Sequence, residues 1–210
     1  VSAIFLSLTF TNNVYAQNLL WAKQISGTSQ EYGRAVAVDA TGNLFACGYY
    51  RGTVDFNPGV GTYTMTSSGD WDIYVTKTDA SGNFVWAKSF GSPSASDDQA
   101  FTLTLDASSN VYTTGYFTNI ADFDPGVGTF TLATTGNRDA FVSKLDANGD
   151  FVWARQLGGA GDDIGYNVSV DAAGNVYSCG YFSGSADFNP GVSTNTLTSV
   201  GSSDIYISKL

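Results

Sequence analysis

The sequence predicts an all-β protein built from three copies of one unit of about 66 residues. The motif W-A-K or W-A-R recurs with spacings of 65 and 67 residues, at Trp21, Trp86 and Trp153. A turn-like segment of the form D-A-x-[GS]-N recurs in the same phase, at Asp39, Asp106 and Asp171. No part of the chain shows a sustained period of about 3.6 residues, so we expect essentially no helix.

Each unit divides into four expected strands. The first alternates apolar residues with others, over residues 34–38, 101–105 and 166–170. The second is apolar on both faces, over residues 44–50, 111–117 and 176–182. That pattern indicates a sheet covered by neighbouring sheets on both sides. The third strand starts at Asp72, Asp139 and Asp204, and the fourth carries the tryptophan.

The connections between these strands are of two kinds. Tight D-A-x-[GS]-[ND] turns join the first strand to the second and the third to the fourth. Their aspartate can bond its own backbone, and glycine tolerates a positive φ. The loop between the second and third strands is longer and contains D-F-[ND]-P-G. A glycine inside each second strand, at 48, 115 and 180, leaves room for a neighbouring backbone or large side chain.

Antiparallel four-stranded units that are buried on both faces are typical of β-propeller blades. We therefore predict a partial, propeller-like array of three four-stranded blades over residues 17–210. The chain opens with an expected fourth strand, residues 19–25, and stops at Leu210 with a third strand. Closed propellers have about four to eight blades, so we expect further blades beyond Leu210 and an exposed end prone to self-association in this chain.

The repeated motifs also resemble a known family. The pattern D-A-x-G-N-V-Y-x-x-G-Y-F, then D-F-[ND]-P-G and K-L-D-A-x-G-x-F-V-W-A, resembles the bacterial β-propeller repeats called SBBP. The resemblance covers almost all of residues 17–210. The resemblance implies a propeller fold and a location outside the cytoplasm, and it assigns no catalytic residue to this chain.

The first sixteen residues have the composition of a secretory signal remnant. Residues 1–10 are almost wholly apolar and uncharged, and V-Y-A follows, ending at Ala16. Small residues at these positions are typical of cleavage by signal peptidase, here ahead of Gln17. An ordinary strand is the alternative. The apolar run is too short to span a bilayer, so we expect a secreted or outer-surface protein without a membrane span.

Composition excludes several classes of function. Nine Lys and Arg stand against nineteen Asp and Glu, for a net charge of −10. Nucleic acid and anionic membranes attract the opposite charge, so neither is an expected partner. The chain contains no histidine, which excludes His-based triads and His metal ligands. We expect no cofactor, with calcium as the one alternative.

The D-F-[ND]-P-G loops allow two interpretations. Their carboxylates could contribute to calcium sites, with candidates at Asp55, Asp122, Asp124 and Asp187. Calcium takes about six or more oxygen ligands, and each loop offers at most two acidic side chains. The Asn-Pro-Gly sequence also suits a tight turn without any ion. We favour a structural corner, with calcium as the alternative.

The long loops and the crossings between blades should share one acidic face, because they leave the strands at the same end. Functional loops often lie on such a face. Candidate ligand contacts there are Trp71, Glu31, Asp98 and Asp163. The repeated tryptophans are better explained by blade-to-blade packing than by stacking on sugars. Cys47 and Cys179 lie a blade apart and are interpreted as small buried residues without a disulfide.

These observations favour a non-enzymatic secreted or cell-surface module for binding or structural display. The expected ligand at the acidic loop face is a protein or a glycan. One alternative is a carbohydrate-active hydrolase that uses carboxylates on this face. A second is a calcium-stabilised structural array. An active site would require residues that depart from the repeat and converge near the axis.

Overall fold

The computed structural model describes residues 18–210, and in this range every regular element is a β-strand. Three repeats follow one another, at residues 31–90, 99–159 and 164–209. Their first strands are β2 (Glu31–Val38), β9 (Gln99–Leu105) and β15 (Ile164–Val170). Their second strands are β3 (Leu44–Tyr50), β10 (Val111–Phe117) and β16 (Val176–Phe182).

The third strands are β6 (Gly69–Thr78), β13 (Asp139–Leu145) and β19 (Asp204–Lys209). The fourth strands are β7 (Phe84–Phe90) and β14 (Phe151–Gly159). Three short hairpins lie between second and third strands: β4 (Thr53–Asp55) with β5 (Thr64–Thr66), β11 (Ile120–Asp122) with β12 (Thr131–Ala133), and β17 (Ser185–Asp187) with β18 (Thr196–Thr198). Two short strands, β1 (Ser26–Gly27) and β8 (Ser94–Asp97), complete the set.

The three main sheets are antiparallel meanders. Repeats 1 and 2 have the orders β2-β3-β6-β7 and β9-β10-β13-β14, and repeat 3 has the order β15-β16-β19. The four strands predicted for each unit are therefore present in repeats 1 and 2, whereas repeat 3 has only its first three strands among residues 18–210. Residues 19–25, expected as a fourth strand, form none. A strand needs a hydrogen-bonding neighbour, and this segment precedes any third strand with which it could pair.

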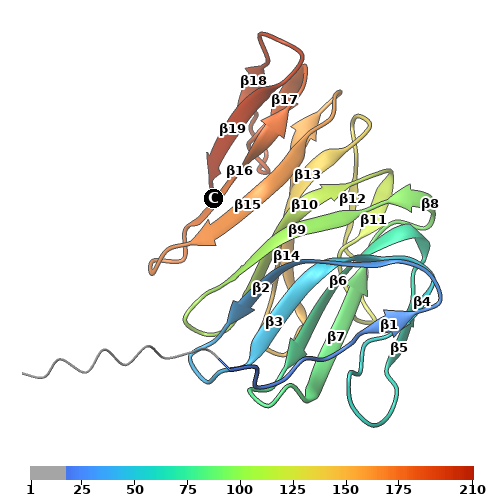
Figure 1. Ribbon diagram of the computed structural model, residues 1–210. Helices are drawn as coiled ribbons and strands as arrows, with labels where there is room; N and C mark the ends of the chain where they lie inside the picture. Colours follow the sequence, from blue (N-terminus) through green and yellow to red (C-terminus); the bar gives the residue numbers. More distant parts are fainter. Residues whose placement is uncertain (1–17) are drawn as a thin grey trace, which may run out of the picture.

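The sheets lie side by side, with the first strands innermost, and β9 contacts both β2 and β15 (Figure 1). One apolar core fills the space between repeats 1 and 2, and it includes Phe45, Val75, Val111 and Phe141. A second core lies between repeats 2 and 3. All seven residues of β10, the middle second strand, are buried. Coverage on both faces explains why the second strands are apolar throughout.

The tight turns form as predicted. In the first, Asp39 Oδ1 accepts the backbone amides of Thr41 at 2.9 Å and Asn43 at 3.0 Å. Gly42 has a φ of +85°. In the second repeat Ser109 takes the place of this glycine and adopts a φ of 61°. The aspartate therefore fixes each turn through its carboxylate, and glycine is favoured by the backbone conformation.

The repeated tryptophans join successive repeats. Trp86 Nε1 donates to the carbonyl of Ala147 at 3.3 Å, in the turn after the third strand of the next repeat. Trp21 Nε1 makes the equivalent bond to Ala80 at 3.4 Å. Trp21 thus occupies the position of a fourth-strand tryptophan although its segment is not a strand. These contacts agree with the packing interpretation.

Each hairpin pairs with the segment that immediately precedes its own repeat. The end of β14 pairs with β17, with Gly158 opposite Asp187. Gly91 forms the same bridge to Asp122, and β1 pairs with β4. The backbone ladder thus continues from the fourth strand of one repeat into the hairpin of the next.

The two cysteines are free and differ in burial. Cys47 is buried between repeats 1 and 2, whereas Cys179 is only half-buried. The expected burial of Cys179 is therefore wrong, because no following sheet covers its face of repeat 3. Among residues 18–210, no helix is long and apolar enough to cross a bilayer. The predicted signal remnant, residues 1–16, lies outside the described residues.

Candidate functional site

The D-F-[ND]-P-G loops are built around carboxylates that hold backbone amides. Asp55 Oδ1 accepts the amides of Asn57 at 3.0 Å and Tyr63 at 2.8 Å. Asp122 and Asp187 make the same pairs of bonds in their own loops. These bonds close each loop without an ion, which is the geometry that a structural corner requires.

The second polar residue of each loop also bonds to its own turn. Asn57 Oδ1 accepts the amide of Gly59 at 2.9 Å, and Asp124 Oδ1 accepts that of Gly126 at 2.8 Å. Within residues 18–210, no group of three or more acidic, His or Cys side chains is arranged to hold a metal ion. Calcium at Asp122 and Asp124 remains a hypothesis.

Two of the expected ligand contacts, Asp98 and Asp163, are fully buried. Asp98 accepts the amides of Ser92 and of Thr118, the latter at 2.8 Å. Asp163 accepts those of Gly159 and Ser183. Burial raises the pKa of both carboxyls to about 6. This placement differs from the expected exposed position, because the crossing loops fold inward and use these carboxylates as anchors.

Each buried anchor lies beside a second aspartate. A β-carbon added at Gly91 would meet Asp98 and Asp72, both within 3.1 Å. Gly158 is enclosed in the same way by Asp139 and Asp163. Neighbouring negative charge adds to the effect of burial on the pKa of both Asp98 and Asp163. The third expected acid, Glu31, is half-buried, and its Oε1 has no hydrogen-bond partner within residues 18–210.

Trp71 lies in an aromatic group at the loop end of repeat 1. Its ring is 5.6 Å from that of Tyr32 and 5.2 Å from that of Tyr49. The guanidinium of Arg51 covers it at 5.4 Å. The side chain is half-buried, so part of its surface is accessible.

Further residues, which the repeated motifs did not reveal, extend the aromatic group around Trp71 along the first strands of the three repeats. Each first strand carries a β-bulge at the same place relative to its second strand. The bulged residues are Arg34, Phe101 and Tyr166. Arg34 lies 5.4 Å from the Phe101 ring, and the Phe101 and Tyr166 rings stack at 5.6 Å. One residue from each repeat thus joins a continuous row.

We call Tyr32, Arg34, Trp71, Phe101 and Tyr166 the aromatic row. A buried tyrosine supports it in repeats 1 and 2: Tyr49 accepts a hydrogen bond at its hydroxyl from Arg34 at 2.5 Å. Tyr116 donates to Asp97 at 2.7 Å and lies under Arg138. Burial, together with the bond to Asp97, raises the pKa of Tyr116, so its hydroxyl remains a donor at neutral pH.

Three of the four arginines of this acidic chain gather here. Arg51 pairs with Asp70 at 3.3 Å, and Arg138 pairs with Asp97 at 3.6 Å. Arg34 has no acidic partner among residues 18–210. Arg34 is an exposed residue, and its guanidinium lies against aromatic rings. The row therefore combines a cation that can meet a carboxylate or carbonyl with flat apolar surface.

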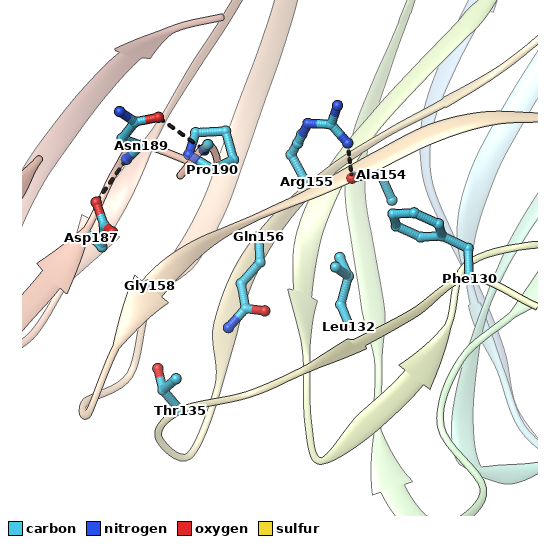
Figure 2. Close-up of a pocket in the computed structure, with 11 residues that line it drawn as sticks. Phe130, Leu132, Thr135, Ala154, Arg155, Gln156, Gly158, Asp187, Asn189 and Pro190 are labelled. Carbon is cyan, nitrogen blue, oxygen red and sulfur yellow. Dashed lines mark hydrogen bonds between the residues drawn. The ribbon is translucent and has the colours of Figure 1, made fainter. Parts of the chain in front are cut away.

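A groove lies elsewhere, between repeats 2 and 3 (Figure 2). Its volume is about 350 Å³, and it runs from Phe130 and Leu132 past Gln156 to Asn189 and Pro190. Arg155 lines it and donates to the carbonyl of Ala154 at 2.8 Å. An equivalent groove lies between repeats 1 and 2, with Pro125 in the place of Pro190. Because it recurs with the repeat, this groove follows from the spacing of neighbouring sheets and does not mark a specific site.

Two comparisons with known proteins bear on this arrangement. Residues 152–189 match the sequence pattern of the SBBP β-propeller repeat. The chain is 27% identical over 189 residues to an uncharacterized WD repeat-containing protein, L264, of Acanthamoeba polyphaga mimivirus. The similarity covers 79% of this chain and 14% of the viral protein, so the chain spans a small part of that relative. The expected propeller-repeat similarity is confirmed for residues 152–189, whereas a bacterial origin is not shown.

Proposed function

We propose that the three sheets are successive blades of a β-propeller arc, and that the chain is a non-enzymatic module that binds a protein through the aromatic row. The observation that carries this proposal is the convergence of Arg34, Phe101 and Tyr166 on the innermost strands. They occupy one repeat position but differ in chemistry. Residues that depart from a repeat while meeting in space are what a binding site on a repeat scaffold requires.

The composition of the row suits a protein partner. Tyr, Trp and Arg are the residues that contribute most often to the binding energy of protein interfaces. Tyr32 and Tyr166 are 43% and 53% exposed, so both rings retain free surface. Their backbones belong to paired strands, which limits the entropy lost on binding. Similarity to a propeller repeat and to a WD repeat-containing protein also supports an interaction module.

The hydrolase alternative has less support. A glycosidase needs two accessible carboxyl groups on either side of the substrate. Asp98 and Asp163 are fully buried and bonded to backbone amides. The glycan alternative shares the aromatic row with the protein proposal, because exposed rings also stack on sugars. The two proposals must therefore be separated by experiment.

We also propose that the module acts outside the cytoplasm. Support comes from the sequence, in the apolar residues 1–10 followed by V-Y-A, and from the resemblance described above. The net charge of −10 fits a soluble module whose partner is neutral or basic overall.

The binding proposal can be tested with a phage-displayed library of random peptides. The chain should enrich peptides, and the Arg34→Ala and Tyr166→Ala variants should each bind those peptides about tenfold more weakly, which corresponds to about 1.4 kcal/mol. The matched control is Val127→Ala, which removes a fully exposed apolar side chain on the β11–β12 loop. A glycan array run in parallel with the same variants tests the alternative. Enrichment that survives both substitutions, or glycan binding alone, would overturn the proposal.

A further inference from the structure

The junction between repeats 2 and 3 encloses two carboxyl groups. Asp139 opens β13, and Asp163 ends the loop that crosses from β14 to β15. Both residues are fully buried. A β-carbon added at Gly158 would lie 2.7 Å from Asp139 Cγ and 2.9 Å from Asp163 Oδ2, so the two groups meet across this glycine. Among residues 18–210, no lysine or arginine forms an ion pair with either of them. Two buried negative charges without a cation would repel each other.

The hydrogen bonds of this pair leave one oxygen free. The two oxygens of Asp163 accept the amides of Gly159 at 2.7 Å and Ser183 at 3.2 Å. Asp139 Oδ2 accepts the amide and the hydroxyl of Thr135. Asp139 Oδ1 is the one oxygen of the four that has no donor within residues 18–210. A buried carboxylate oxygen without a donor is costly, whereas a protonated one carries no charge and acts as a donor itself.

The preceding junction provides an internal comparison. Asp72 and Asp98 meet across Gly91 in the same way, between repeats 1 and 2. There each carboxylate oxygen accepts a hydrogen bond, from Ser68, Gly69, Ser92 and Thr118. The two junctions therefore share a carboxyl pair and differ at one oxygen, which identifies Asp139 Oδ1 as a position for a proton.

We propose that Asp139 and Asp163 hold one proton between them, and that this proton fixes the crossing loop, residues 160–163, between repeats 2 and 3. When the proton passes to solvent, the pair carries two negative charges in a buried space. The loop is attached through Asp163, whose carboxylate bonds to both repeats and whose amide donates to the Arg138 carbonyl at 2.8 Å. Repulsion should therefore open this loop, while the sheets stay paired through their own backbone ladders.

The surroundings of the pair determine the pH at which the proton is lost. The donor nearest to Asp139, besides Thr135, is the neutral side chain of Gln156. Arg138 precedes Asp139 but pairs with Asp97. The other ionisable groups around the pair are neutral or negative: Asp162, Asp187, Tyr181 and Tyr206.

Burial is the largest cause that raises the pKa of both carboxyls, and neighbouring negative charge raises that of Asp163 further, to about 6. Coupled groups titrate as a pair, so this value describes release of the shared proton. Because the pKa is raised in the folded chain, the stabilisation is present at pH 5 and is lost as pH rises through about 6. The crossing loop should therefore be closed at pH 5 and loosened at pH 8.

The first test is amide hydrogen exchange of the full chain by NMR at Gly159, Asp163 and Ser183, with each rate divided by the intrinsic rate at that pH. Protection should be about tenfold lower at pH 8 than at pH 5, the ratio that follows from a pKa of about 6 against 3.8. Asp139→Asn supplies a neutral partner of the same shape and should make protection equal at both pH values.

The matched control for exchange is Asp171→Asn, in a tight turn. A hydrogen bond from Asn175 contributes most to lowering the pKa of Asp171, to about 2, so this group does not titrate between pH 5 and pH 8. The control should keep the tenfold difference. Equal protection at both pH values in the parent chain, or a difference that Asp139→Asn leaves unchanged, would overturn the proposal.

The second test asks whether the proton is shared, by thermal melts at pH 5 and pH 8. Asp139→Asn and Asp163→Asn should each remove the same part of the gain in Tm, and the double variant should remove no more. Asp98→Asn, in the preceding junction, should add its own loss to that of Asp139→Asn. Losses from Asp139→Asn and Asp163→Asn that add would refute a shared proton.

A third measurement requires no substitution, so it does not depend on how the variants fold. In a carbon-13 NMR titration of the parent chain, the carboxyl signals of Asp139 and Asp163 should move together with one midpoint at a pH of about 6. Two carboxyls that are both fully ionised at pH 5 would contradict the proposal.

Discussion

The guanidinium of Arg34 lies 5.4 Å from the ring of Phe101, the residue at the same bulge position in the next repeat. The bulge adds one residue to each inner strand and turns its side chain out of the regular alternation. The fold therefore brings together three side chains that are about 66 residues apart in the sequence.

Replacing Arg34 should affect binding more than stability. An exposed cation over an aromatic ring contributes about 0.5–1 kcal/mol, so Arg34→Ala should lower the free energy of unfolding by no more than this. Urea denaturation measures the change. Arg155→Ala is the matched control, because Arg155 covers Trp153 at 5.6 Å outside the row. It should cost similar stability and leave peptide binding intact.

The glycine inside each second strand should not tolerate a side chain. A β-carbon at Gly115 would overlap the carbonyl group of Gln99 on the neighbouring strand. We expect Gly115→Ala to destabilise the protein by about 2–3 kcal/mol, as overpacking does. Gly201→Ala is the control, because apart from its two chain neighbours no residue in the described range 18–210 has an atom within 4 Å of its added carbon. Equal melting temperatures for the two variants would contradict this account of the second strand.

The buried aspartates should make the protein more stable at mildly acidic pH. Burial raises the pKa of Asp98 and Asp163 from 3.8 to about 6. Between these values the folded chain binds protons that the unfolded chain does not, so stability rises as pH falls from 7 to 4. We expect a gain of about 1–2 kcal/mol, or about 3–6 °C in Tm, between pH 8 and pH 5.

The aspartates of the tight turns should destabilise the protein only at a lower pH than the one tested above. A hydrogen bond from the Asn175 side chain contributes most to lowering the pKa of Asp171, to about 2, so the Asp171 turn loses stability only as pH falls below about 4.

The contribution of Asp98 can be measured with the Asp98→Asn variant. Thermal melts of this variant should show a smaller gain in Tm between pH 8 and pH 5 than the parent chain. A gain of the same size would assign the proton uptake to other groups.

The D-F-[ND]-P-G corner should be stable without calcium. If Asp122 acts through its two amide bonds, millimolar Ca²⁺ should leave Tm unchanged, and Asp122→Ala should cost about 1–3 kcal/mol with or without the ion. Differential scanning calorimetry with calcium and with a chelator measures both. A calcium-dependent rise in Tm that Asp124→Ala removes would instead support the calcium-stabilised array.

Processing at the N-terminus is tested most directly by mass spectrometry. When the chain is expressed behind a complete secretory leader that extends it upstream of Val1, we expect the exported product to begin at Gln17. Substituting Ala16 by Leu should block cleavage there. An exported product that retains residues 1–16 would favour the alternative that they belong to the folded domain.

The sequence predicts the strands and turns well because both are local and repeat with the unit. The Asp39 turn needs a short carboxylate and a residue that tolerates positive φ, and both can be recognised from the residue types alone. The bulge at Arg34 is not visible, because it depends on the register between two strands. In the sequence alone, Arg34 fits the alternation with Val36 and Val38.

The sequence also did not predict which acidic loop residues would be buried. Asp98 and Asp97 are adjacent in a crossing loop, yet only Asp98 is fully buried. The difference comes from the fold of the loop over Gly91, which directly follows repeat 1, and over Thr118 of repeat 2. Sequence position alone does not reveal which carboxylate an inward-folding loop will use as its anchor.

The ladder that runs from β14 into β17 has a mechanical consequence. A hinge between two repeats would have to break backbone hydrogen bonds as well as separate apolar side chains, so the angle between neighbours is locked. Each added repeat should therefore lie at the same angle to the one before it. A partner that spans several repeats would meet a surface of fixed curvature, which does not change shape when the partner binds.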